Sequence, residues 1–437
     1  MPHDPLSAYD LVHDEIDQRR ETGHDVEGAA AVLAATAADD DQALRALYDQ
    51  VCAAGRSATW TYQEPDGLPA ILATLPSAAA DTPPSGAALH DRILGGWLGR
   101  IAGNNLGKPV EDGDHWTSEH LRDYLQRAGA YPLRDYLPVL DPMPGEFVLL
   151  DNWPRTTRGQ VHGADRDDDI DYSILGLHLL EKHGAGLRAE HIASDWLALL
   201  PFLQVYTAER AAYRNLVHGI PLASVARHQN PYREWIGALI RGDAFGWVHP
   251  GDPRAAAVMA YRDASLSHVA NGIYGEMWAA ALIACAFTAD GPREALEGSL
   301  AHVPPGSRLA EAVREVLDVH ADQRSWEQAL VRIQARYGHY SWVHTIDNAA
   351  LITAGLLWGD GDYSATVGLT VQGGWDTDSN GATAGSVAGV LLGAAALPAH
   401  FIDPLEDRTR SALFGFDNSR ISELAARTTR LASQRQA

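Results

Sequence analysis

The most informative part of this chain is the segment Gly373-Gly374-Trp375-Asp376-Thr377-Asp378-Ser379-Asn380-Gly381, in which two carboxylates and a hydroxyl alternate with small residues. The apolar, glycine-punctuated run over 382–399 predicts that a buried helix follows it. Far upstream, a second acidic segment, Asp165-Arg166-Asp167-Asp168-Asp169-Ile170-Asp171, also opens a predicted helix. Carboxylates at this density repel one another unless a cation lies among them. The two segments therefore predict a hard-metal site that the fold assembles from distant parts of the chain.

Helix capping is the competing explanation for both segments. It accounts for one or two of the aspartates in 165–171, and for Asp378 or Ser379, but not for five carboxylates within seven positions. Asp376 and Asp378 lie two apart in a glycine-flanked turn and can point to one side, which suits octahedral oxygen coordination of Mg²⁺ or Mn²⁺. Zinc is disfavoured because no Cys or His pair has ligand spacing. A calcium loop is also disfavoured, since its twelfth position would be Val387 rather than glutamate.

The composition favours a soluble enzyme and disfavours nucleic acid as a partner. Lys and Arg number 34 against 57 Asp and Glu, a net charge of −23, whereas a phosphate backbone requires basic patches. Lys108 and Lys182 are the only lysines, and this arginine bias, with the richness in alanine, indicates a GC-rich bacterial genome. Cys52 and Cys285 suit a reduced cytosol. With no signal-peptide pattern and no apolar run of about 18 residues, we expect a cytoplasmic protein without a membrane partner.

Helical periodicity dominates the sequence and predicts an all-α fold. A linker-like composition over 76–86 separates an N-terminal helical extension, residues 1–85, from one large domain, residues 86–437. Apolar residues recur at i, i+4 spacing over 89–101, and convincing period-2 strands are missing. Small residues in the last core helix should let it approach its neighbours closely: Gly385, Gly389, Gly393 and Ala396. The extension should contain short helices over 6–20, 26–36 and 41–52.

A third segment of interest is Gly103-Asn104-Asn105-Leu106-Gly107-Lys108-Pro109-Val110-Glu111. Its two glycines and its proline are expected to bend the chain off the end of the helix over 89–101 and to present Glu111. Taken alone, the segment indicates a helix C-terminus with a surface glutamate rather than a functional site.

Together, the three segments resemble those of the ADP-ribosylglycohydrolase family, whose motifs are G-D-A-x-G-x-P-x-E, T-D-D-T and G-G-D-T-D-T. Their order, spacing and helical context agree over about residues 88–400. The resemblance implies a compact all-α fold with two Mg²⁺ ions at its centre, Mn²⁺ being an alternative. Carried over by position, the metal ligands would be Glu111, Asp167, Asp168, Asp169, Asp376, Asp378 and Ser379. Glu111 and Asp168 would be the catalytic residues.

Three positions depart from the family pattern. Asp167 and Ser379 stand where threonine is usual, and Asn104 replaces an aspartate. Serine keeps the hydroxyl oxygen, so the change at Ser379 is mild. Asp167 adds a negative charge, which we expect to tighten cation binding.

The segment 242–251 resembles a diverged form of the family loop that wraps the substrate's diphosphate. The resemblance implies substrate contacts from Gly242, Ala244, Phe245 and Gly246, and Trp375 inside the metal motif could stack on a ring. The family's arginine is replaced by Trp247. An ordinary surface loop rich in glycine and proline is the alternative.

The implied activity is Mg²⁺-dependent removal of ADP-ribose from a protein side chain or a small acceptor. Glu111 would act as a mobile gate or base, while Asp168 and Asp376 anchor the metal ions. Three alternatives remain: hydrolysis of another ribosyl or nucleoside-like N-glycoside, a metal-free glycosidase, and a non-catalytic ADP-ribose-binding homologue. Acyl transfer, NTP hydrolysis and dinucleotide redox chemistry lack their motifs.

Overall fold

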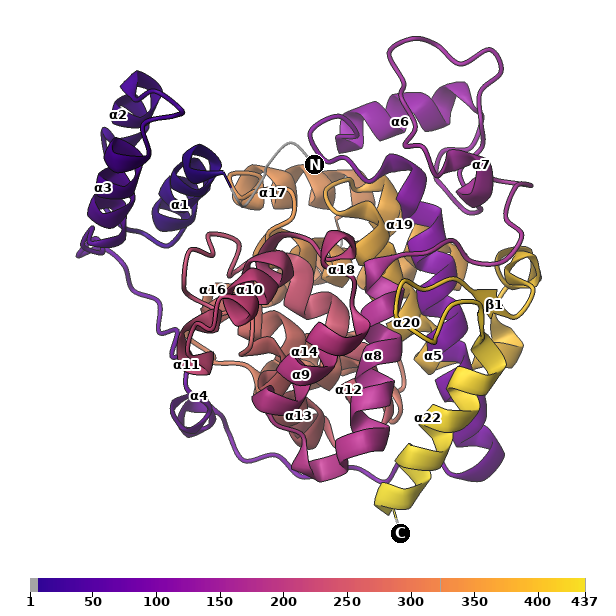
Figure 1. The fold of residues 1–437 in the computed structure, drawn as a ribbon. Coiled ribbons are helices and arrows are strands. Elements are labelled where there is room, and N and C mark those ends of the chain that lie inside the picture. The colour runs from indigo at the N-terminus through magenta and orange to yellow at the C-terminus, as the bar shows by residue number, and fades with distance from the viewer. Residues whose placement is uncertain (1–6, 323, 437) are drawn as a thin grey trace.

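The computed structural model describes residues 7–322 and 324–436, which fold into helices α1 to α22 (Figure 1). In this part of the chain the strands are two short ones, β1 (Arg408–Thr409) and β2 (Ser419–Arg420), which pair antiparallel. The all-α prediction is therefore confirmed. Within the same ranges, no helix combines the length and the apolar character needed to cross a membrane.

Two antiparallel helices, α5 (Gly86–Gly107) and α20 (Thr377–Leu392), form the centre of the fold and lie side by side in Figure 1. Their backbones nearly touch, because glycines face each other along the contact. A Cβ atom built on Gly103 would lie 2.0 Å from the carbonyl oxygen of Gly381, and one on Gly99 would lie 2.2 Å from that of Gly385. This packing fixes the C-terminal end of α5 beside the N-terminal end of α20.

Helix α5 is longer than the sequence predicted. Gly103 and Gly107 were expected to turn the chain away, yet both are helical, and a 3₁₀ turn, η1 (Lys108–Val110), follows directly. A Cβ on Gly107 would lie 2.3 Å from the carbonyl oxygen of Thr377. These glycines therefore serve helix packing rather than helix termination. Of the small residues expected to pack, Gly385 does so, while Gly393 ends α20 at φ 80°.

The other helices of the main domain surround this pair in one continuous apolar core. Helices in contact with α5 or α20 are α8 (Asp168–His183), α14 (Ala270–Ala286), α18 (Thr345–Gly359), α19 (Tyr363–Gln372), α15 (Pro292–Ser299), α21 (Ala399–Ile402) and α22 (Ile421–Gln436). The remaining helices are α6 (Ser118–Arg127), α7 (Trp153–Thr156), α9 (Ala189–Leu199), α10 (Thr207–Val217), α11 (Leu222–Val225), α12 (Asp243–Trp247), α13 (Pro253–Ala264), α16 (Arg308–Ala321) and α17 (Trp326–Tyr337). Further 3₁₀ turns are η2 (Gly184–Gly186), η3 (Phe202–Gln204), η4 (Ile236–Arg241), η5 (Leu300–His302), η6 (Ala394–Ala396) and η7 (Asp403–Leu405).

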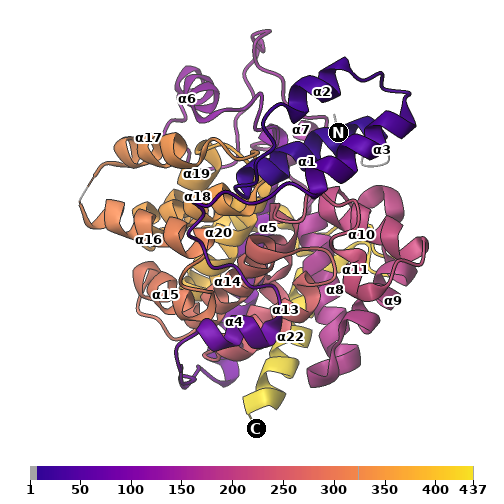
Figure 2. The same ribbon diagram turned by 90° about the vertical axis from the view of Figure 1, so that its left-hand side faces the viewer.

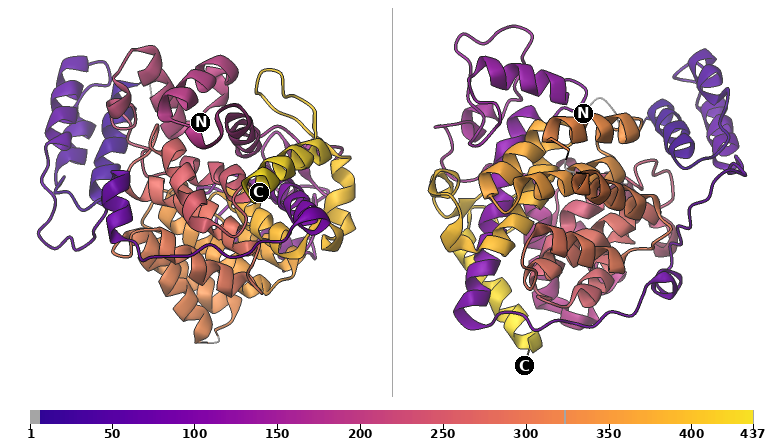
Figure 3. Two further views of the ribbon diagram at one scale, coloured as in Figure 1. Left: turned by 90° about the horizontal axis from the view of Figure 1, so that it is seen from below. Right: turned by 180° about the vertical axis from the view of Figure 1, so that it is seen from behind.

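The N-terminal helices form a layer of their own at one side of the main domain (Figure 2). The predicted helices appear as α1 (Ala8–Glu21), α2 (Ala29–Ala35) and α3 (Asp41–Cys52), and they share a small separate apolar cluster. After α4 (Leu68–Thr74), the chain runs over the main domain to α5 without regular structure (Figure 3).

Helix α1 contacts the main domain through buried polar groups. The Glu15 carboxylate accepts two hydrogen bonds from the guanidinium of Arg233, at 2.7 and 2.9 Å. Gln18 donates to the carboxylate of Glu234 at 3.1 Å. Further along, Glu64 pairs with Arg308 at 2.9 Å. The extension is thus held by charge pairing, which fails if either partner is removed.

Candidate metal centre

The three acidic segments meet where α5, α8 and α20 begin or end. Asp167 is the N-cap of α8, and its side chain accepts from the backbone amide of Asp169 at 2.9 Å. Asp376 occupies the N-cap position of α20 without a capping hydrogen bond from its side chain. Glu111 follows the 3₁₀ turn after α5. All three line one cavity of about 810 Å³.

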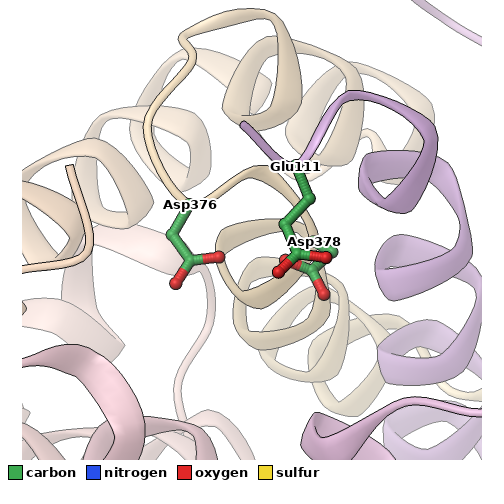
Figure 4. Close-up of side chains that lie close together, drawn as sticks. All are labelled: Glu111, Asp376 and Asp378. Carbon is green, nitrogen blue, oxygen red and sulfur yellow. The ribbon is translucent and has the colours of Figure 1, made fainter. Parts of the chain in front are cut away.

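Two carboxylate triads lie in this cavity and share Asp378. In the Glu111 triad (Glu111, Asp376, Asp378), one oxygen of each residue lies within 4.8 Å of the others. The Asp167 triad (Asp167, Asp169, Asp378) meets the same distance criterion. Figure 4 shows the Glu111 carboxylate lying beside that of Asp378, with Asp376 facing the same space from the start of α20. The arrangement could hold metal ions in two neighbouring positions.

The hydrogen bonding of the Glu111 triad fits a bound cation. Asp376 and Asp378 are 5% and 2% exposed, and in each of them Oδ1 has no hydrogen-bond partner among the described residues. A buried carboxylate oxygen without a partner is costly, because it has lost water and gained nothing in exchange. Oxygen ligands of this kind are those that Mg²⁺ and Mn²⁺ prefer.

The pKa values of these acids show the same need for positive charge. Burial raises the pKa of Asp376 to about 6, and burial together with the neighbouring Asp167 raises the pKa of Asp168 to about 8. Burial and the surrounding carboxylates also raise the pKa values of Glu111 and Asp378. Without a cation, part of this cluster holds protons at neutral pH, and a metal ion must displace them.

Two basic side chains form ion pairs with the Asp167 triad. The Lys108 ammonium lies 2.6 Å from Oδ2 of Asp167, and Arg100 lies 3.1 Å from Oδ1 of Asp169. Although burial raises the pKa of Asp167, Lys108, with smaller contributions from Arg166 and the amide of Asp169, lowers that pKa to about 2. The added negative charge of Asp167 is therefore matched inside the protein, which the sequence did not reveal.

The structure divides the acidic segment 165–171 between two roles. Asp165 lines the cavity but pairs with Arg155 at 2.9 Å, outside the triads. Asp171 accepts from the hydroxyl of Ser411 at 2.6 Å and is not among the residues that line the cavity. Asp167, Asp168 and Asp169 also line the cavity, and Ser379 joins them by donating to Asp169 Oδ2 at 3.0 Å. The five carboxylates that the sequence grouped together thus include two structural ones.

Aromatic side chains line the same cavity as the acids. Trp375 lines it from a left-handed backbone conformation at φ 58°, which costs free energy for a bulky residue and is most often kept at functional sites. The cavity lining also contains aromatic residues that the sequence did not single out: Tyr206, Trp235, Tyr340 and Trp342. For Tyr340 and Trp342, the only signal was the density of aromatic residues over 337–342.

The model of the ADP-ribosylglycohydrolase family matches residues 85–437. The chain belongs to the ADP-ribosylglycohydrolase family. A solved structure described as an ADP-ribosylglycohydrolase-related protein complex is similar at 19% identity and a TM-score of 0.48, over 79% of this chain and 99% of that one. No curated protein matches the sequence.

Family membership supports an enzyme that hydrolyses a glycosidic bond and suggests an ADP-ribose-type substrate, and the two triads could hold a metal ion. The matched region begins one residue before α5, so helices α1 to α4 lie outside it. It includes both triads and all the carboxylates at the cavity.

The segment that resembled the ADP-ribosylglycohydrolase phosphate loop does not reach the cavity. Gly242, Ala244, Phe245 and Gly246 are buried in or beside α12 and are not among the cavity-lining residues. Their glycines pack against α14: a Cβ on Gly246 would lie 2.7 Å from the side chain of Ile283. The expected phosphate contacts and the alternative of a surface loop both give way to a buried helix, because this segment is apolar enough to join the core.

Proposed function

We propose that this protein hydrolyses a ribosyl glycosidic bond with Mg²⁺, or Mn²⁺ in its place, and releases ADP-ribose from a modified protein side chain or a small acceptor. The observation that carries the proposal is the pair of triads around Asp378, with buried oxygens that lack partners, opening onto a cavity large enough for a nucleotide. The proposed ligands of two ions are Glu111, Asp167, Asp168, Asp169, Asp376, Asp378 and Ser379.

Cleavage of a ribosyl bond develops positive charge at C1 of the ribose. Bound Mg²⁺ supplies Lewis acidity, which polarises hydroxyl groups and lowers the pKa of water. The carboxylates of Asp168 and Asp376 would hold the cations and would supply negative charge near C1. As the C1–acceptor bond breaks and the C1–oxygen bond to water forms, Glu111 takes the water's proton and later returns it to the acceptor or to solvent.

Glu111 suits the role of gate and base because of where it lies. It is partly exposed, follows a short 3₁₀ turn rather than sitting within a long helix, and faces the cavity. Such a residue can change its side-chain conformation as the substrate enters. Trp375, Tyr340 and Trp342 line the same cavity and provide flat apolar surface for a nucleobase.

A second candidate is hydrolysis of a simpler ribosyl or nucleoside-like N-glycoside. It is favoured by the burial of residues 242–246, which removes the contacts expected for a diphosphate.

Turnover assays separate the candidates. Peptides carrying ADP-ribosyl-arginine or ADP-ribosyl-serine, and plain nucleosides, are incubated with the protein and Mg²⁺, with EDTA and Asp376→Ala as controls. We expect release of ADP-ribose that both controls abolish. Cleavage of nucleosides alone supports the second candidate. If neither substrate class is cleaved, catalysis is refuted, and calorimetry with ADP-ribose then tests the non-catalytic alternative.

A further inference from the structure

The two triads differ in how much of their negative charge the protein has already neutralised. In the Asp167 triad, both oxygens of Asp167 are engaged: Oδ1 accepts from the amide of Asp169 at 2.9 Å and from Asn104 at 3.0 Å, and Oδ2 accepts from Lys108 at 2.6 Å. Both oxygens of Asp169 are engaged as well, Oδ1 by Arg100 at 3.1 Å and Oδ2 by Ser379 at 3.0 Å.

The Glu111 triad has no such direct pair, and the charge of Lys108 acts on Asp378 and Glu111 less strongly than on Asp167. No hydrogen bond or ion pair from a basic side chain to Glu111, Asp376 or Asp378 is found in the described residues, and Oδ1 of both aspartates lacks a partner. The nearest contact is a long one, from the neutral amide of Asn104 to Oδ2 of Asp378 at 3.3 Å. The oxygen lone pairs of the Glu111 triad are therefore available to a cation, and no existing charge pair has to be broken.

Lys108 is built into the Asp167 triad rather than resting against it. The side chain is 6% exposed, and its ammonium also donates to the backbone carbonyl of Arg166 at 2.6 Å. A buried ammonium held at two points cannot swing away when a metal ion arrives. It therefore stays as a positive charge beside any ion that the triad binds, and it repels that ion.

We propose that Lys108 acts as an internal cation that makes the two metal positions unequal. The Glu111 triad binds the first ion tightly, and the Asp167 triad binds the second ion weakly, because Lys108 and Arg100 already neutralise two of its three carboxylates. Saturation of the second position then depends on the concentration of free Mg²⁺. This inference rests on the proposed function only in requiring that the cluster binds metal ions.

The alternative is that Lys108 only stabilises the fold by pairing with Asp167, with no effect on metal binding. These two roles of Lys108 can be distinguished by a substitution that removes the charge and keeps the length of the side chain. Lys108→Met does this, and Lys182→Met is a matched control, because Lys182 is the other lysine of the chain and likewise pairs with a buried aspartate, Asp195, at 2.5 Å.

Binding of Mn²⁺ to the metal-free, full-length protein is measured by the loss of the free-ion electron paramagnetic resonance signal, and binding of Mg²⁺ by calorimetry. For the wild type, we expect two classes of ion whose dissociation constants differ by about tenfold or more. In Lys108→Met, the weak class should tighten by about tenfold or more, whereas Lys182→Met should match the wild type.

Two ions of equal affinity in the wild type overturn the inference, and so does an unchanged weak class in a folded Lys108→Met. If that variant does not fold, as judged by circular dichroism, the wild-type isotherm decides alone. A wild type that binds no ion at all refutes the metal requirement of the proposed function. That outcome is distinct from two equal ions, which refute only the role of Lys108.

Discussion

Gly103→Ala tests whether the contact between α5 and α20 sets the geometry of the metal centre. The added methyl would lie 2.0 Å from the carbonyl oxygen of Gly381, whereas an ordinary contact requires about 3.4 Å. The blocking atom is backbone, so no side-chain rotation relieves the clash and the helices must part by about 1 Å. Overpacking of this kind costs about 1–3 kcal/mol, against which alanine returns up to about 1 kcal/mol in helix propensity.

We therefore expect Gly103→Ala to lower the free energy of unfolding by about 1–2 kcal/mol, measured by urea denaturation with circular dichroism. It should also weaken Mn²⁺ binding by about tenfold, although residue 103 is not a ligand, because Asp378 lies on α20 and Glu111 follows the 3₁₀ turn that continues α5, so parting the helices moves the two carboxylates relative to each other. Gly186→Ala is the control, since a Cβ there meets nothing within 4 Å. Wild-type stability and affinity in Gly103→Ala would refute the reasoning.

Three further predictions concern charge. Asp376→Asn should abolish tight metal binding while leaving the circular dichroism spectrum unchanged, because it removes a ligand charge without changing volume; calorimetry checks this. The metal-free protein should lose stability as pH rises from about 4 towards 8, since the folded-state pKa values of Asp376 (about 6) and Asp168 (about 8) lie above the usual value of about 4. Saturating Mg²⁺ should remove that loss, and identical pH profiles with and without Mg²⁺ in thermal unfolding would contradict it. Glu15→Ala should destabilise the protein by about 3 kcal/mol, because it leaves Arg233 buried without its partner, and a loss below about 1 kcal/mol in urea denaturation would show that the pair is dispensable.

The assembly of the acidic site could be predicted from the sequence because its signal is chemical. Carboxylates crowded at helix starts repel one another unless they share a cation. The segments 165–171 and 373–381 were therefore expected to come together around a metal ion. Which of the aspartates face the cavity could not be predicted. Asp171 is turned away by Ser411, a residue 240 positions later, and no local pattern announces that contact.

Glycine gave the least reliable local signal. In the segment 103–111 it suggested the end of a helix, and in 242–251 it suggested a ligand-binding loop. In both cases the glycines permit close helix packing, against α20 and α14 respectively. A glycine marks a place where backbone must come close to something, but the sequence does not say whether that is a ligand or another helix. The pairing of Lys108 with Asp167 was hidden for a similar reason, since 59 positions separate them.

The most direct test of the central claim is a crystal structure of the protein with Mn²⁺ and ADP-ribose, with anomalous scattering used to locate the metal. We predict anomalous peaks at the Glu111 triad and, at lower occupancy, at the Asp167 triad. The terminal ribose should bind over Asp378, and the adenine should lie against Trp375. No anomalous peak at either triad, or ADP-ribose bound away from the cavity, would contradict the proposed metal-dependent hydrolysis.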